Sequence, residues 1–209
     1  MKNLTQIQWL KYTLTNIPDG FGDMYWKKSG SLKISFVILI LFFFGIIAED
    51  RLYGFQFSAD YDRNFNIIPY LMKSIILFMA WTVGNWSVCT LLDGVGTIKN
   101  IFIYSAYAIS PYVMQIYINL ILSHILVRDE YIFMQLTEIV GTVWSVILIF
   151  SAVKAVHQYT LKKTFTAIIL TLVMMLIMFI IMILFMLLIQ QILIFIAEIS
   201  TEIIYRSRT

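Results

Sequence analysis

Hydrophobic residues are gathered in five long runs along this chain, and short polar segments separate the runs. To within a few residues, the runs extend over Ser31–Ala48, Ile67–Leu92, Ile98–Leu126, Tyr131–Val156 and Phe165–Ile199. Each run is near or beyond the roughly 20 apolar residues that a helix needs to cross a bilayer. The pattern therefore predicts an all-α, polytopic integral membrane protein with five transmembrane helices.

The segment before the first run has an amphipathic pattern. Its apolar residues can share one side of a helix: Leu4, Ile7, Trp9, Leu10 and Leu14. This spacing predicts a short interfacial helix. We therefore divide the chain into a cytoplasmic N-terminal segment, residues 1–30, and a five-helix membrane domain, residues 31–209. The segment is a membrane-surface anchor or a docking site for a cytoplasmic partner, and the pattern leaves both interpretations open.

The composition supports a membrane protein. Of the 209 residues, 60% are hydrophobic and 13% are charged, whereas roughly 25% are charged in soluble domains. A soluble fold could not bury so much apolar surface, so we expect contact with membrane lipid and no nucleic-acid partner. Cys89 is the only cysteine, which excludes an intrachain disulfide.

The basic residues predict the orientation in the membrane. With the N-terminus in the cytoplasm, the cytoplasmic segments carry Lys2, Lys11, Lys27, Lys28, Lys33, Lys99, Lys154, Lys162 and Lys163, and the outer segments carry Arg51, Arg63, Arg128, Arg206 and Arg208. This asymmetry predicts a multi-pass protein of the cell membrane with an extracellular C-terminus. The competing interpretation of the first run is a cleaved signal peptide. It is disfavoured because a long hydrophilic stretch precedes the run and no clear cleavage site follows.

The loop "DGVGT", residues 93–97, resembles strings that hold a phosphate or a metal ion in soluble enzymes. It lacks a second carboxylate and the P-loop pattern, so a structural turn between two helices is the favoured interpretation. We expect Gly94 to end the second helix in the left-handed conformation and Thr97 to cap the third, with Gly96 inside the turn. We also expect a basic or amide partner, and no metal, at Asp93. The candidate basic partners are Lys99, Lys162 and Lys163.

Pro111 interrupts the third run and predicts a kink or local unwinding there. The carbonyl that it frees should be satisfied by a neighbouring helix or by water. Small residues around it allow close helix contact: Ser105, Ala106, Ala108 and Ser110. A packing kink is favoured over a substrate site, although broken helices do hold substrates in transporters.

Two charges lie inside the predicted spans. Lys73 and Glu138 are each about two turns from the outer end of their run, at a depth of roughly 10 Å. Charges at such depth usually face the bundle interior and find a partner, which predicts an ion pair, joined by His124 or a water. The equal alternative is that Lys73 extends outward along its apolar stem, while Glu138 is protonated or reaches a backbone group.

The fifth run is too long to cross the membrane upright, so it should tilt strongly or project on the outer side. Gln190 and Gln191 should then lie near the outer boundary, with at least one of them facing another helix. Methionines recur at every fourth position in this run: Met174, Met178, Met182 and Met186. A copper(I) path is one interpretation, but no cysteine or histidine joins the row, so lipid contact and core filling are favoured.

Enzymatic interpretations find little support. An intramembrane aspartyl protease needs two facing aspartates, and Asp93 is the only aspartate at a membrane-embedded helix end. A serine enzyme needs a serine beside a histidine, and His124 and His157 are predicted on opposite membrane faces. We therefore expect no catalytic residues, no cofactor and no metal site.

Several short motifs carry a resemblance to a known family. They are "PDGF" (18–21), "NW" (Asn85 and Trp86), "DGVGT" (93–97), "YAISPY" (Tyr107 to Tyr112, with Pro111) and "HQYTLKKT" (157–164). In these motifs the chain resembles bacterial, Firmicute-type members of the Yip1-domain family over most of its length. The resemblance implies five spans, a cytoplasmic N-terminus and an outward C-terminus.

The same resemblance bears on function. Eukaryotic members engage small GTPases in membrane trafficking, but their Asp-Leu-x-Gly-Pro motif is not matched by "LLDGVG", so GTPase binding is not carried over. Bacterial members often accompany carbohydrate ABC transporters and have no established enzymatic activity. The favoured prediction is a non-enzymatic membrane scaffold or accessory protein with a membrane-protein partner, ABC transporter subunits among the candidates. The alternative is a small solute or ion transporter or channel, whose path would be lined by Lys73, Asn85, Pro111 and Glu138.

Overall fold

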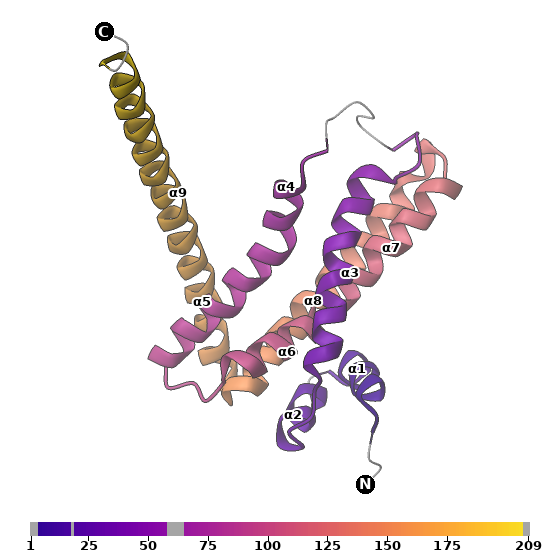
Figure 1. Cartoon of the computed structure of the whole chain (residues 1–209). Helices are drawn as coiled ribbons and strands as arrows, with labels where there is room; N and C mark the ends of the chain where they lie inside the picture. Colours follow the sequence, from indigo (N-terminus) through magenta and orange to yellow (C-terminus); the bar gives the residue numbers. More distant parts are fainter. Residues whose placement is uncertain (1–3, 18, 58–64, 207–209) are drawn as a thin grey trace.

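The computed structural model describes residues 4–17, 19–57 and 65–206, and within them every regular element is helical. The elements are α1 (Gln6–Thr15), α2 (Asp19–Trp26), α3 (Leu32–Arg51), α4 (Ile67–Leu71), the π-helix η1 (Met72–Ile76), α5 (Leu77–Leu91), α6 (Ile98–Ala108), α7 (Ser110–Ile125), the 3-10 turn η2 (Arg128–Glu130), α8 (Tyr131–His157) and α9 (Leu161–Arg206) (Figure 1). The candidate spans are Leu32–Arg51, Ile67–Leu91, Ile98–Ile125, Arg128–His157 and Leu161–Thr201. The prediction of five apolar membrane helices is thus confirmed.

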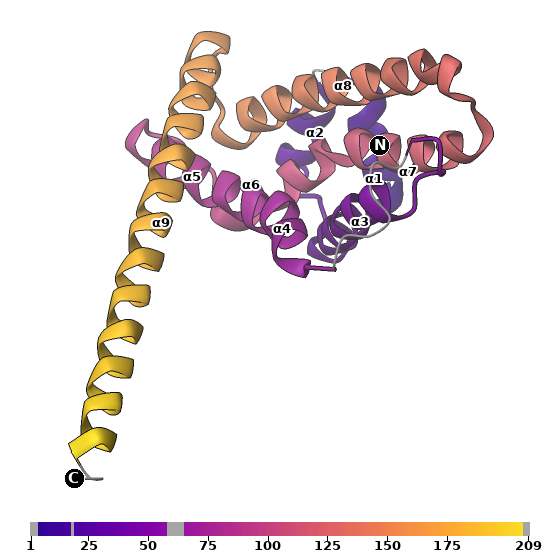
Figure 2. The same cartoon turned by 90° about the horizontal axis from the view of Figure 1, so that it is seen from above.

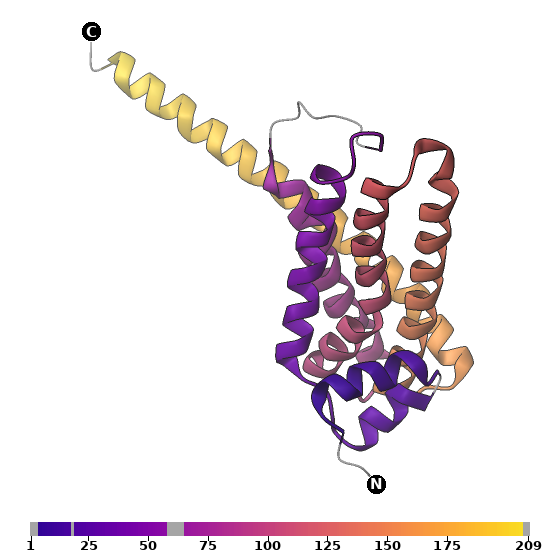
Figure 3. The ribbon, with the colours of Figure 1, turned by 90° about the vertical axis from the view of Figure 1, so that its right-hand side faces the viewer.

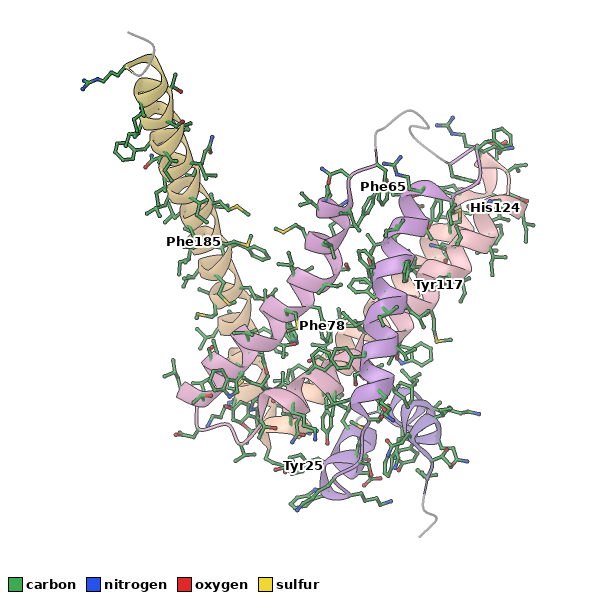
Figure 4. The ribbon with its side chains drawn as sticks, viewed as in Figure 1. Tyr25, Phe65, Phe78, Tyr117, His124 and Phe185 are labelled. Atoms are coloured by element: carbon green, nitrogen blue, oxygen red, sulfur yellow. The ribbon has the colours of Figure 1, made fainter. Side chains whose placement is uncertain are left out.

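The bundle has two ends. The amino-terminal face carries α1, α2, the loop from α5 to α6 and the turn from α8 to α9, and the opposite face carries the ends of α3 and α7 (Figure 3). Tyr25 and His124 mark these two faces in Figure 4. His124 and His157 therefore lie at opposite ends of the bundle, as the sequence predicted.

The N-terminal segment packs against the bundle. A capping box between Thr5 and Gln8 begins α1, and the Tyr12 hydroxyl donates to the Asp23 carboxylate at 2.6 Å, joining α1 to α2. Trp9, Phe21 and Met24 are buried in the main hydrophobic core, together with residues of α3, α6 and α8: Ile38, Leu39, Tyr104, Tyr107, Leu148 and Val156. Pro18, in the "PDGF" motif, lies outside the described residues.

The third span breaks at Ile109, two residues before Pro111, which confirms the predicted interruption. The expected partner of the freed carbonyl was wrong. Ser110 Oγ, within the same span, donates to the Tyr107 carbonyl at 2.6 Å. The neighbouring helix α8 instead satisfies a donor, because the Tyr112 amide donates to Ser145 Oγ at 2.9 Å. The backbone groups at the break, the Tyr107 carbonyl and the Tyr112 amide, are thus hydrogen-bonded by serine hydroxyls in the protein core.

Tyr107 lies beside this break and is fully buried. Its hydroxyl accepts a hydrogen bond from the Ser31 amide at 3.3 Å, at the start of α3. Ser31 makes no side-chain cap of its own, so Tyr107 satisfies one of the amides that every helix start leaves free. Tyr107 is therefore a structural link between α6 and α3.

Helix α9 has two parts with different surroundings. Its proximal part, Leu161–Met182, packs on α5 and α8 through a buried stripe: Thr164, Ala167, Thr171 and Met175. From Ile183 to Thr201 every residue is exposed. This distal part, Ile183–Arg206, stands away from the bundle, as the views from the side and from above agree (Figures 1 and 2).

Gln190 and Gln191 lie on the distal part of α9, and both are exposed. The prediction that one of them faces another helix of the chain was wrong. Phe185, on the same part, is likewise 61% exposed, with no other helix beside it (Figure 4). The apolar run of α9 continues well past the end of its contact with α5, so the distal part of the run does not pack against the rest of the chain.

Candidate functional site at the junction of α5, α8 and α9

The loop from α5 to α6 begins with a tight helix ending. Asp93 adopts the left-handed conformation, with φ of 56°, and the Gly94 amide donates to the Cys89 carbonyl at 2.7 Å. This is the long bond of a Schellman ending, with aspartate at the position usually taken by glycine. The expectation that Gly94 has a positive φ was wrong, because Asp93 takes that conformation. The expected cap by Thr97 is confirmed, since its hydroxyl accepts from the Asn100 amide.

The two glycines of the loop are needed for close approach. A Cβ atom on Gly94 would lie 2.5 Å from His157 Nδ1 and 2.6 Å from the Tyr159 hydroxyl. A Cβ atom on Gly96 would overlap Val156 and lie 2.7 Å from His157 Cε1. Any side chain at either position would therefore push the loop off the end of α8.

His157 connects three helices from the last position of α8. The imidazole is only 2% exposed, and its Nε2 lies 3.0 Å from Asn85 Oδ1 on α5. The Asn85 amide donates to Thr171 Oγ1 on α9 at 3.2 Å, and that hydroxyl donates to the Ala167 carbonyl at 2.7 Å. Because Asn85 Oδ1 can only accept, the chain of bonds assigns the proton to His157 Nε2.

Tyr159 covers the other side of this cluster. Its ring stacks on His157 with centroids 5.3 Å apart, and its hydroxyl lies 3.1 Å from the carbonyls of Cys89 and Leu92. Burial raises the pKa of the Tyr159 hydroxyl, so it stays a neutral donor that satisfies carbonyls at the end of α5. The Lys163 ammonium lies 4.7 Å from the ring centroid. The ring therefore bridges α8, α5 and α9.

His157 Nδ1 is buried and has no hydrogen-bond partner within the described chain. The close approach of Gly94 and Gly96 fills the space in front of it, so this nitrogen faces backbone and not a cavity. The geometry gives a buried, neutral imidazole held by an amide. This arrangement of His157 differs from that of a catalytic histidine. A catalytic histidine needs a nucleophile within reach and a second group that orients the imidazole for proton transfer.

Asp93 lies at the edge of the junction with its side chain exposed. Among the described residues no ion pair joins it to Lys99, Lys162 or Lys163 and no amide donates to its carboxylate, so the expectation of a basic or amide partner was wrong. The described residues also contain no group of three metal-ligating side chains. Asp93 is accounted for by backbone geometry, since aspartate tolerates the left-handed region better than most residues.

The predicted ion pair between Lys73 and Glu138 does not form, although both residues are described; both side chains are exposed. His124 is not a bridge either, because its Nδ1 lies 2.9 Å from the Leu120 carbonyl of its own helix. Lys73 instead lines a cavity of about 540 Å³ with Glu49 of α3 and Tyr112 of α7. Glu49 lies within electrostatic range of both Lys73 and Glu138.

Of the residues singled out from the sequence, Asn85, Asp93, Gly94 and Gly96 come together at the junction, whereas Tyr107 and Pro111 lie at the break of the third span. Lys73 and Glu138 lie in the opposite half of the molecule. Sequence reasoning missed the roles of His157 and Glu49. Each was placed in a loop just past a predicted span, and in each case the helix continues through it.

The junction therefore brings the "NW", "DGVGT" and "HQYTLKKT" motifs into one cluster. The family model of the Yip1 domain matches residues 14–184. The chain belongs to the Yip1-domain family. No curated protein and no solved structure matches it. The Yip1-domain match ends at Leu184, so nearly all of the distal part of α9 lies beyond it. Yip1-domain proteins are in general non-enzymatic membrane proteins.

Proposed function

We propose that this Yip1-domain protein is a non-enzymatic membrane scaffold or accessory protein that binds another membrane protein along the distal part of α9. The observation that carries the proposal is the exposure of every side chain from Ile183 to Thr201. The junction of α5, α8 and α9 supports the scaffold interpretation, because the side chains of Asn85, His157 and Thr171 hydrogen-bond to one another and so join the three helices.

Gln190 and Gln191 point to a protein partner and not to lipid alone. Their amides interrupt an otherwise apolar run, and neither side chain contacts another helix of the chain. Amide side chains within membrane helices usually hydrogen-bond across helix interfaces, since lipid tails offer them no partner. A partner helix with a polar or small residue at this level would satisfy them.

The membrane and the orientation are part of the proposal. The lysines of the amino-terminal face support a cytoplasmic N-terminus and an extracellular C-terminus in a cell membrane. A bacterial, Firmicute-type origin, implied by the sequence motifs, makes subunits of a carbohydrate ABC transporter the first partners to test. With this orientation the distal part of α9 lies in the outer half of the membrane and beyond it.

The transporter or channel interpretation has weaker support. Its four expected path residues lie in different places: Lys73 lines one cavity, Pro111 lines another, and Asn85 is fixed in the junction. Glu138 is on the surface. Solute flux through the purified protein alone in liposomes would favour this interpretation over the scaffold.

Co-purification in mild detergent tests the proposed function. The tagged full chain should retain a membrane protein in fixed stoichiometry, and the double variant Gln190→Leu/Gln191→Leu should lose it. Gln135→Leu is the matched control, because Gln135 is an exposed glutamine on another apolar helix, α8. Equal partner recovery with the double variant and the control would refute binding through α9.

A further inference from the structure

A cavity of about 540 Å³ lies between α3, α7 and the second span, which runs through α4, η1 and α5. Phe42 and Tyr112 line its deep end, and their rings contact each other with centroids 5.9 Å apart. The other end lies at the face where α3 ends and α4 begins (Figure 1). There Glu49, in the last turn of α3, and Lys73 line the walls. The cavity therefore changes from aromatic in the middle of the bundle to charged near that face.

Glu49 and Lys73 are charged side chains without a direct partner. Neither makes a hydrogen bond or an ion pair within the described chain. They lie close enough to interact electrostatically, but they are not in contact. Glu138 of α8 is also within electrostatic range of Glu49, so the surroundings of Glu49 attract a cation. Unpaired charges within a membrane span are unfavourable, so the cavity offers one position for a cation and one for an anion.

Asp50, the next carboxylate along α3, is already paired. The Tyr70 hydroxyl donates to Asp50 Oδ2 at 2.5 Å and accepts from Arg51 Nε at 2.9 Å. Arg51 Nε also lies 3.4 Å from Asp50 Oδ2. Among the described residues that line the cavity, Glu49 and Lys73 are therefore the charges that still lack a partner.

The wall that carries Lys73 departs from regular helix geometry. The second span changes from α-helical to π-helical over Met72–Ile76, and Lys73 lies within this turn. Ser74 Oγ donates to the Tyr70 carbonyl at 2.6 Å across the same turn. Single π-helical turns inside α-helices occur frequently at functional sites. The backbone at Lys73 is therefore an independent reason to regard this wall as part of a binding site.

The order of the lining residues and their chemistry select the ligand. Glu49 is in the last turn of α3, Lys73 is more than one turn into the second span, and Leu77 is one turn deeper. A carboxylate only accepts hydrogen bonds, so the half-buried Glu49 needs N–H donors, which a primary ammonium has and a trimethylammonium group lacks. The Lys73 ammonium suits a phosphate oxygen. Ammonium, phosphate and acyl chain follow one another in this order in an ethanolamine phospholipid.

We propose that this cavity binds the zwitterionic headgroup of an ethanolamine phospholipid from the leaflet opposite the amino-terminal face. The ammonium binds at Glu49, the phosphate binds at Lys73, and the acyl chains leave the cavity past Leu77. Leu77 is 43% exposed, so this exit is open to lipid. The same zwitterion without acyl chains, glycerophosphoethanolamine, is water-soluble and lacks the part that contacts Leu77.

Photo-crosslinking of the full chain tests the ligand. Phosphatidylethanolamine and phosphatidylcholine probes with the same diazirine-bearing acyl chains are compared at an equal small fraction in phosphatidylglycerol nanodiscs, and labelled peptides are mapped. Labelling of α3 and α5 at the cavity should be about fivefold stronger with the ethanolamine probe, because only its ammonium donates to Glu49. Equal labelling by the two probes, or label spread evenly over the exposed residues of α8 and α9, would overturn the proposal. Glycerophosphoethanolamine should not displace the probe, and displacement would overturn the lipid as the source of the zwitterion.

Charge variants assign the two ends of the headgroup. Glu49→Gln should remove the preference for the ethanolamine probe, whereas Asp129→Asn, at an exposed carboxylate of the same face outside the cavity, should keep it. Lys73→Gln should weaken labelling by both probes about fivefold, because both carry the phosphate, and Arg128→Gln should not. A preference that survives in Glu49→Gln would contradict the ammonium position.

A third pair of variants tests the exit for the acyl chains. Leu77→Trp should block labelling at the cavity, whereas Met79→Trp, at a residue of α5 that is also 43% exposed but lies outside the cavity, should leave it unchanged. Labelling that is the same in both variants would contradict the site. The comparison of the two probes on the unsubstituted chain needs no variant, so it tests the site even where a substitution impairs folding.

Discussion

The proximal and distal parts of α9 have nearly the same apolar character but different surroundings. The proximal part buries Thr164, Ala167 and Thr171 against its neighbours, whereas every residue of the distal part from Ile183 to Thr201 is exposed. The difference lies in side-chain size, because helices in a membrane associate through close packing and polar contacts and not through hydrophobicity. Small and hydroxyl residues therefore mark where α9 contacts the bundle, and the stretch from residue 183 to residue 196, where α9 has left it, contains none.

The largest expected effect concerns the loop from α5 to α6, which packs against the end of α8. Gly96→Val should cost about 3 kcal/mol of unfolding free energy, since its side chain would overlap Val156 and His157. Thermal unfolding in detergent, followed by size-exclusion chromatography, measures the change. Gly22→Val is the control, because a Cβ atom on Gly22 meets nothing within 4 Å. Equal melting temperatures for the two variants would contradict the close approach.

Removing the central amide of the junction should have the next largest effect. Asn85→Leu leaves His157 Nε2 and Thr171 Oγ1 without their partner and should cost about 2 kcal/mol. In the distal part, Gln190→Leu should leave the stability of the isolated chain unchanged, because Gln190 contacts no other helix. Thermal unfolding of both variants compares the two parts directly. A loss in Gln190→Leu as large as that in Asn85→Leu would remove the distinction between them.

A smaller effect is expected from the Tyr159 hydroxyl. Tyr159→Phe keeps the ring stacked on His157 but leaves the carbonyls of Cys89 and Leu92 without this donor, at a cost of about 1 kcal/mol. Hydrogen exchange should also become faster in the last turn of α5. Tyr131→Phe, at an exposed tyrosine of α8, should change neither quantity; a change there of the same size would show a general effect of losing a hydroxyl.

The smallest effect is expected in the distal part itself. Leu187→Ala and Leu188→Ala should each change the unfolding free energy by less than about 0.5 kcal/mol, as exposed positions usually do. Met175→Ala, in the buried stripe of the same helix, should cost about 2 kcal/mol. Thermal unfolding of the three variants would show whether the proximal part of α9 contributes more to the unfolding free energy than the distal part. Similar losses in all three would indicate that the distal part folds back onto the bundle.

The five spans could be predicted because a helix needs a run of about 20 apolar residues to cross the hydrocarbon core, and such runs are visible in the sequence alone. The break near Pro111 could also be predicted, because the ring removes a helical hydrogen bond whatever surrounds it. The partner of the freed carbonyl could not, since the choice between Ser110, a neighbouring helix and water depends on side-chain rotamers. The division of the chain at residue 30 stays a prediction, as does the orientation.

The site was less predictable than the spans. Asn85 and the "DGVGT" loop were recognised, but the role of His157 depends on one further residue of helix at the end of α8, and boundaries are the least reliable part of a sequence-based assignment. Glu49 was missed for the same reason at the end of α3. The failed pair of Lys73 and Glu138 shows that equal depth in two helices does not establish that their side chains face each other.

The apolar run of α9 also links the protein to the thickness of its membrane. From Phe165 to Ile199 the helix is about 50 Å long, against a hydrocarbon core of about 30 Å. Each ångström of mismatch between the two lengths costs a fraction of a kcal/mol, whether the helix tilts or the lipid stretches. A thicker bilayer reduces this cost, so the protein should partition toward the thickest lipid available to it, independently of any partner.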